Sequence, residues 1–83
     1  MTPELIERFV EQPQRDNMVV NIHFKDRDTV TGIFIRGTDY DELKGKNFWR
    51  VISSTHMDDW AKTRNMSLPR IFNGASFTRL TDK

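Results

Sequence analysis

The hydrophobic positions of the first dozen residues recur with the spacing of an α-helix. One side of the helical wheel carries the apolar residues Leu5, Ile6, Phe9 and Val10. Thr2 is suited to cap the N-terminus of this helix, and Pro3 stands at the favoured first position. The pattern predicts a helix over about residues 3–12, which Pro13 ends.

From residue 18 onward the apolar period changes to two, which indicates β-strands. The pattern predicts strands over about residues 18–25, 29–36, 48–53, 67–72 and 75–80. Gly32 interrupts the second strand and indicates a bulge or a sharp bend. The third strand has bulky apolar residues on both faces, so we expect it to be buried on both sides or to meet another subunit.

The segment RIFNGASFTRL, residues 70–80, ends this series of strands. Its Asn73-Gly74 pair lies between apolar runs and predicts a tight turn between two paired strands. We therefore expect a closing hairpin at the end of a small sheet. The polar stretches 37–47 and 54–66 are expected to be a loop and an irregular connection.

Length and composition predict one globular, soluble domain over residues 1–83. The chain has 83 residues, of which 36% are hydrophobic and 30% are charged. It has no cysteine, which excludes disulfides and zinc sites built on thiolates. No apolar run is long enough to span a membrane and no leader is evident, so we expect a cytoplasmic protein without a membrane partner.

The charges are distributed unevenly between the two halves of the chain. Residues 1–42 hold five basic and nine acidic side chains, whereas residues 43–83 hold eight basic and three acidic ones. This asymmetry fits an anionic partner for the second half, or subunits that pack unlike surfaces together. It also fits a solvated surface on which the charges mix once the chain has folded.

The polar residues do not form a recognisable catalytic or metal-binding set. The acidic group at 39, 41 and 42 lacks the spacing of an EF-hand loop, which favours a solvated acidic loop. His56, Asp58 and Asp59 supply no nucleophile with an oriented base, and His23 falls on the polar side of its strand. We therefore expect no enzyme, no metal and no cofactor.

Aromatic and basic residues are interleaved in the second half of the chain. Such a mixture suits single-stranded nucleic acid, because bases stack on aromatic rings while phosphates meet Lys and Arg. The candidate contacts are Lys44, Lys46, Arg50, Trp60, Lys62 and Arg64. In the alternative interpretation, Trp60 anchors a loop on the body of the domain.

The order of the predicted elements resembles that of the Sm-like family. Ile71, Phe72, Gly74 and Phe77 match the family's final turn motif, while Asn73 stands where the family has an arginine. Gly32 matches the glycine of the second strand, and Asp39 and Asn47 resemble the loop Asp and Asn, although their separation is longer.

The resemblance implies a mainly β fold, a small bent antiparallel barrel of about five strands with an N-terminal helix. An SH3-like barrel gives much the same pattern. The resemblance also implies an RNA-binding homo-oligomer, although the missing arginine removes one of the residues that the family uses for RNA.

Two functions follow as hypotheses. The first is a non-catalytic module that binds RNA or single-stranded DNA. The second is a protein-interaction or scaffold module with no nucleic-acid ligand, which uses an exposed strand edge and aromatic residues.

Overall fold

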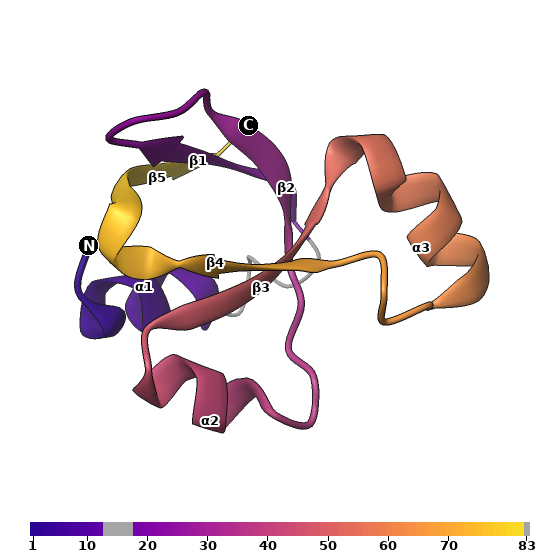
Figure 1. Cartoon of the computed structure of the whole chain (residues 1–83), viewed down its shortest axis with the longest axis horizontal. Helices are drawn as coiled ribbons and strands as arrows, with labels where there is room; N and C mark the ends of the chain where they lie inside the picture. The colour runs from indigo at the N-terminus through magenta and orange to yellow at the C-terminus, as the bar shows by residue number, and fades with distance from the viewer. Residues whose placement is uncertain (13–17, 83) are drawn as a thin grey trace.

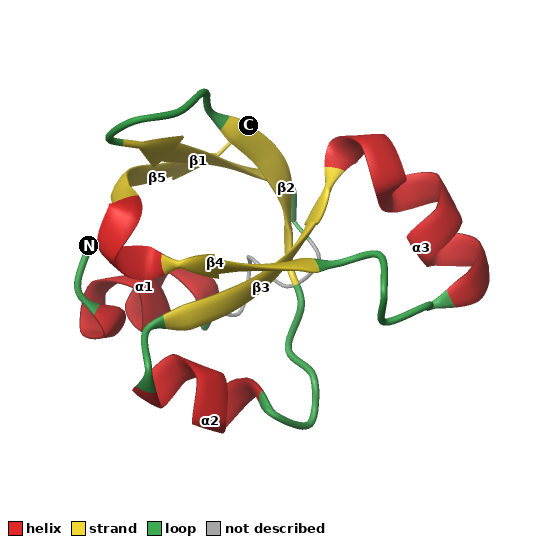
Figure 2. Cartoon of the chain, in the orientation of Figure 1, coloured by secondary structure: helices red, strands yellow, loops and turns green. Residues whose placement is uncertain are grey.

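The computed structural model describes residues 1–12 and 18–82. Short helices lie between the strands at several points along the chain, as Figures 1 and 2 show. In chain order the elements are α1 (Pro3–Val10), β1 (Val20–Phe24), β2 (Val30–Phe34), α2 (Tyr40–Gly45), β3 (Phe48–Ser53), the 3₁₀ turn η2 (Ser54–His56), α3 (Met57–Thr63), β4 (Arg70–Asn73), the 3₁₀ turn η3 (Gly74–Ser76) and β5 (Phe77–Asp82). All five predicted strands are present, mostly shorter than expected, and Pro13, predicted to end the first helix, lies outside the described residues.

The strands form one antiparallel sheet in the order β4-β3-β2-β1-β5. The prediction of a closing hairpin is wrong, because β4 pairs with β3 and β5 pairs with β1 at the opposite edge. The connection between them is a 3₁₀ turn in which the side chain of Asn73 accepts a hydrogen bond from the N–H of Ala75 at 2.9 Å. No glycine in the described residues has a positive φ, so the tight primed turn expected at Gly74 does not form.

The predicted closed barrel is not present either. The two edge strands of the order, β4 and β5, are not paired with each other, so the sheet remains open. It is strongly bent all the same, and Figure 1 shows β2 curving from the β1 side of the molecule to the β3 side. The ladders on both sides of Gly32 keep a regular register, so the predicted bulge does not form there. The glycine is needed for a close approach instead, since a Cβ there would lie 2.3 Å from the backbone oxygen of Ile52.

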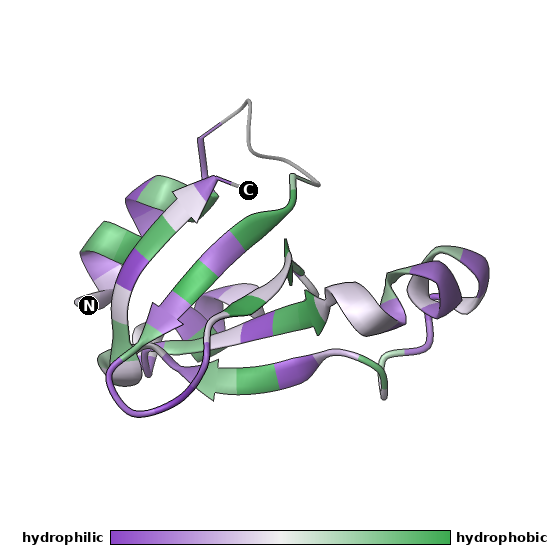
Figure 3. Ribbon diagram, turned by 90° about the horizontal axis from the view of Figure 1, so that it is seen from above, coloured by the Kyte–Doolittle hydropathy of each residue, from purple (hydrophilic) through white to green (hydrophobic). Residues whose placement is uncertain are grey.

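One face of the sheet and α1 enclose the hydrophobic core. Figure 3 shows hydrophobic and hydrophilic residues alternating along the strands, as a sheet with one buried face requires. Helix α1 contributes Ile6 and Val10, whereas Leu5, predicted on the same face, is 47% exposed. The remaining core residues are Val20, Ile22, Trp49, Val51, Phe77 and Leu80.

Two predicted irregular regions contain helices. The polar stretch 37–47 holds α2, and the stretch 54–66 holds η2 and α3. Both helices are short and have few apolar residues, so the hydrophobic period that reveals α1 is missing from them. They are held by tertiary contacts instead, since both α2 and α3 contact β3.

Asn47 joins the N-terminus, β3 and the turn between β4 and β5. Its side-chain oxygen accepts a hydrogen bond from Trp49 Nε1 at 2.8 Å, and its amide donates to the carbonyl of Met1 at 3.2 Å. Its backbone oxygen accepts from the N–H of Gly74 at 2.8 Å. Asn47 adopts a left-handed conformation with a φ of 61°, which asparagine tolerates better than most residues.

Candidate functional site

The six residues predicted to contact nucleic acid lie in three separate places. Lys44 lies in α2, with Lys46 at its C-terminal cap, and Arg50 lies in β3. Trp60 and Lys62 lie in α3, with Arg64 at its C-terminal cap. Figure 1 shows α2 and α3 on different sides of the molecule. The structure therefore does not bring the six side chains together on one surface.

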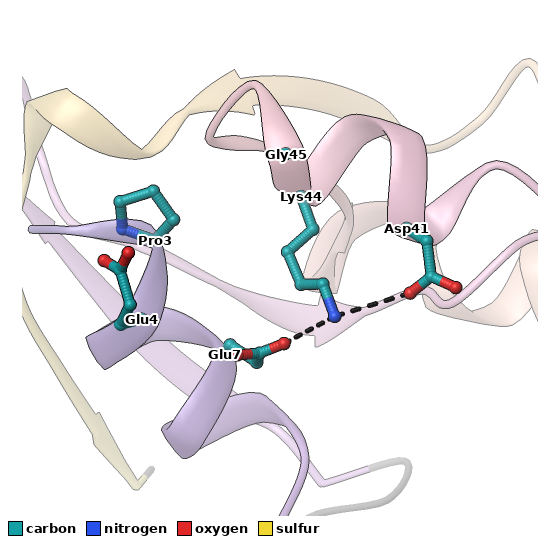
Figure 4. A pocket seen from close by; sticks show the side chains of 6 residues that line it. All are labelled: Pro3, Glu4, Glu7, Asp41, Lys44 and Gly45. Atoms are coloured by element: carbon teal, nitrogen blue, oxygen red, sulfur yellow. Dashed lines mark ion pairs between the residues drawn. The ribbon is translucent and has the colours of Figure 1, made fainter.

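Lys44 is surrounded by carboxylates. Its ammonium group pairs with Glu7 and lies 3.4 Å from both Glu11 and Asp41, as Figure 4 shows for Glu7 and Asp41. The hydrogen bond to Glu7 raises the pKa of Lys44 above its usual range. The charge of Lys44 is thus already balanced inside the protein.

A pocket of about 250 Å³ lies beside Lys44, between α1 and α2 (Figure 4). Its lining contains three carboxylates and one ammonium group, so its electrostatics do not favour a phosphate. The residues that line it are Pro3, Glu4, Glu7, Asp41, Lys44 and Gly45.

Arg50 is engaged in a similar way. Its guanidinium donates two hydrogen bonds to Asp39, with Nη1 at 2.5 Å from Oδ1 and Nη2 at 3.0 Å from Oδ2. The hydrogen bonds between them lower the pKa of Asp39 and raise the pKa of Arg50, and the attraction of the opposite charges adds to both shifts. Since Asp39 precedes the first turn of α2, the pair fixes this helix to β3.

Trp60 is the anchor of α3. Its side chain is 9% exposed, and the guanidinium carbon of Arg64 lies 5.4 Å from the centre of its ring. A buried ring offers little surface for stacking with a base. The arrangement is the one expected for a tryptophan that holds a connection against the sheet, whereas Lys62 remains exposed.

The histidines and carboxylates that the structure describes do not gather into a metal-binding cluster. His23 is held between two threonines, with Nε2 3.1 Å from Thr81 Oγ1 and Nδ1 3.2 Å from Thr29 Oγ1. Within residues 1–12 and 18–82, no three His, Cys, Asp or Glu side chains gather as the ligands of a metal ion would.

The outer face of the sheet, opposite the core, is divided into a polar and an apolar half. On β1, β2 and β5 it carries hydrogen-bonded polar pairs, such as Thr31 with Asn21 at 2.7 Å. On β3 and β4 it carries Ile52, and Ile71 beside Arg50, because residues paired across an antiparallel ladder share a face. Ile52 is fully buried, as Trp49 and Val51 are on the core face, so β3 has buried residues on both sides as predicted. Ile71 is 50% exposed, to about the same extent as Leu5 and Met66.

The backbone of β4 is paired on one side only. The N–H of Gly74 donates to Asn47 O, and the N–H of Ile35 donates to Arg50 O. Alternation along the ladder then directs the backbone groups of Phe72 toward β3 and those of Ile71 away from it. The N–H and C=O of Ile71 therefore point toward the edge where no strand of the described chain pairs.

The stretch of sequence that contains β4 is basic, although Arg79 within it lies in β5 at the opposite edge of the sheet. From Trp60 to Leu80 the chain has no acidic residue, but it has Lys62, Arg64, Arg70 and Arg79. Met66, in the connection from α3 to β4, is a second exposed apolar residue at 49% exposure. We define the β4 edge as Met66, Arg70, Ile71, Phe72 and Asn73.

The sequence analysis predicts an exposed strand edge but does not identify β4 as that edge. The absence of acidic residues over 60–80 is a signal that could have drawn attention to it. The pairing of the whole sheet decides which strand lies at an edge. The expected hairpin paired β4 with β5, so it left no free edge at β4.

Comparisons with known proteins identify no family: no protein-family model, no curated protein and no solved structure matches the chain. Within the described part of the chain, none of the helices combines the length and the apolar character that a membrane crossing needs.

Proposed function

We propose that this protein is a non-catalytic interaction module that binds a protein partner along the β4 edge. The observation that carries the proposal is the position of Ile71. There, outward-pointing backbone groups and a half-exposed aliphatic side chain occur at the same residue of an edge strand. An edge of this kind is a template for strand addition, in which backbone hydrogen bonds give affinity and neighbouring side chains give specificity.

The charge pairing argues against the proposed nucleic-acid surface as the main site. Lys44 and Arg50 are engaged by carboxylates, and the ring of Trp60 is covered. Single-stranded nucleic acid needs unpaired cations beside open aromatic faces. Binding of RNA or single-stranded DNA is therefore an alternative outcome of the test below.

We also propose that the fold is related to the Sm-like and SH3-like small β folds. The support is the order of the elements: an N-terminal helix, a bent β1–β2–β3 sheet, a longer connection, and β4 and β5 joined by a short turn. In this proposal a homo-oligomer is one form that partner binding through a free edge can take. The proposal does not include the RNA recognition of the Sm-like family, because Asn73 stands where the family has an arginine.

Two substitutions at one position test the proposed function. Ile71→Pro removes the outward N–H without removing a hydrogen bond to β3, since the ladder bonds are made by the residues on either side. Ile71→Thr is the matched control, because it keeps the N–H and the β-branched shape. The bait is the tagged chain, recovered in parallel from untreated and nuclease-treated lysates of the cells that express it. The readout is the mass of the recovered complex and its ratio of absorbance at 260 and 280 nm.

The expected result is one protein partner in stoichiometric amount, which is retained by Ile71→Thr and lost with Ile71→Pro. A second copy of the chain is included among the partners, and the solution mass of the purified protein detects it. Recovery of nucleic acid in place of protein, or equal recovery with both variants, would contradict the proposal. Thermal melting of both variants establishes that the sheet is intact.

A further inference from the structure

We infer that the partner contributes an extended acidic segment, in which apolar and acidic side chains alternate and which adds to the sheet as a sixth strand beside β4. This inference rests on the proposed function and specifies its ligand. It follows from the backbone, the two side-chain faces and the charge of the β4 edge.

The backbone of the β4 edge defines a short strand. β4 spans four residues, Arg70–Asn73, and Pro69 before it has no N–H to offer an added strand. The outward N–H and C=O of Ile71 lie inside this span. A bound segment therefore pairs with only a few residues, and its affinity depends on its side chains as well as on its backbone.

The two faces of β4 differ in chemistry. Ile71 lies on the outer face, whereas Arg70 and Phe72 lie on the other, because successive strand residues point to opposite sides. An added strand has the same alternation, so every second side chain lies next to Ile71 and the others lie next to Arg70. The complementary sequence alternates an aliphatic residue with an acidic one.

The cations of the Arg70 side are not neutralised by the protein itself. In the part of the chain that the structure describes, neither Arg70 nor Arg27 forms an ion pair with a carboxylate. The guanidinium carbon of Arg27 lies 5.4 Å from the centre of the Phe72 ring and 5.1 Å from that of Phe24. Arg27 is thereby held next to β4 although Asp26 and Asp28 flank it in the sequence.

The lack of ion pairs at Arg70 and Arg27 distinguishes the β4 edge from the surface of α2. Around Lys44, carboxylates of α1 and α2 surround the cation, whereas no acidic residue occurs from Trp60 to Leu80. Nucleic-acid phosphates carry the same charge as carboxylates. They use neither the outward backbone groups nor the aliphatic side chain of Ile71, so an acidic protein segment fits more of the site.

Two labelled peptides test the inference. The probe is a fluorescein-labelled octapeptide of alternating valine and glutamate, and its control is the same peptide with lysine in place of glutamate. Anisotropy titrations use the full chain at about 0.05 M and about 0.5 M salt, where charge interactions are weakly and strongly screened. We expect the glutamate peptide to bind about tenfold more tightly than the lysine peptide at low salt, and the ratio to fall at high salt.

Variants of the chain assign this binding to the β4 edge. Arg70→Glu should weaken binding of the glutamate peptide by about fivefold to tenfold and strengthen binding of the lysine peptide. Ile71→Pro should weaken both peptides by about tenfold through the lost hydrogen bond and the bulk of the ring, while Ile71→Thr, which keeps the N–H but loses part of the aliphatic surface, should weaken them less. Lys46→Glu, on the exposed side of α2, is the charge control and should leave the glutamate peptide within about twofold.

The outcomes separate this inference from the proposed function. If the peptides bind equally, or if Arg70→Glu has no effect, the acidic ligand is overturned, while a partner that depends on Ile71 keeps the proposed function. If the partner recovered from the lysate is insensitive to Ile71→Pro, the proposed function fails as well. A labelled uridine octanucleotide that binds more tightly than the glutamate peptide, regardless of Ile71, overturns both in favour of RNA.

Discussion

Asn47 is the residue at which a single change should be most informative about the fold. Trp49 is 1% exposed, and its Nε1 donates to Asn47 Oδ1 at 2.8 Å. Replacing Asn47 with alanine removes this acceptor, and an unsatisfied buried donor costs about 1–3 kcal/mol. Alanine must also adopt the left-handed conformation at a φ of 61°, which costs roughly a further 1 kcal/mol.

The free energy of unfolding should therefore fall by about 2–4 kcal/mol in Asn47→Ala. Asn47→Gly separates the two contributions, because glycine loses the same side chain and adopts positive φ freely. It should be more stable than Asn47→Ala by about 1 kcal/mol. Urea unfolding followed by far-ultraviolet circular dichroism measures both, since this signal does not depend on the tryptophan fluorescence that the substitution perturbs.

A double-mutant cycle with Trp49→Phe tests the hydrogen bond itself. The two changes should be non-additive, with a coupling of at least about 0.5 kcal/mol, because each removes one partner of the same bond. Equal stability of the alanine and glycine variants would refute the conformational part of the reasoning. Additive effects in the cycle would refute the part that concerns the bond.

Three further predictions concern glycine contacts and charge. Gly74→Ala should destabilise the protein by about 1–3 kcal/mol, because its Cβ would lie 2.3 Å from Asn47 Oδ1 and 2.5 Å from Ile6 Cδ1. The control is Gly45→Ala, whose new Cβ has no atom within 4 Å. It should be neutral or stabilising in the same urea experiment. Gly32→Ala should be more damaging than Gly45→Ala, since its new Cβ would meet the backbone oxygen of Ile52, and a thermal melt comparable to that of Gly45→Ala would contradict the proposed close approach of β2 and β3. Arg50 lowers the pKa of Asp39 below its ordinary value of 3.8, so the ionised carboxylate stabilises the fold above that pH and this contribution is lost as the pH falls through the lowered pKa. Asp39→Asn should therefore make stability less dependent on pH in this acid range than it is in the parent chain or in the exposed-turn control Asp28→Asn, as measured by melting temperature against pH.

The sequence predicts those parts of the fold that the hydrophobic period encodes. Helix α1 and strand β1 were identified because their apolar residues repeat with one clear period. The helices α2 and α3 escaped prediction because their hold on the sheet comes from single contacts, such as Arg50 with Asp39 and the burial of Trp60. Such contacts join residues that are distant in sequence, and no local pattern reports them.

The error at Asn73-Gly74 has a different cause. The pair is a correct signal for a change of direction, but its use as a hairpin assumes that the two strands pair with each other. Gly74 is needed here for another reason, since it packs against Asn47, Ile6 and Trp49 too closely for a Cβ. The local signal identified the turn, while the pairing was decided by β1 and β3, which each bind one of the two strands.

The same pairing explains why the candidate site was misplaced. Basic and aromatic residues can form one binding surface only if they remain free to contact a ligand after folding. In the folded chain, Lys44 and Arg50 form ion pairs that hold α2, and the buried Trp60 holds α3. Residues that the fold does not use are better candidates for a partner. Ile71 is such a residue, because its side chain is half exposed and its backbone groups point away from the sheet, and the proposed function assigns it to a partner.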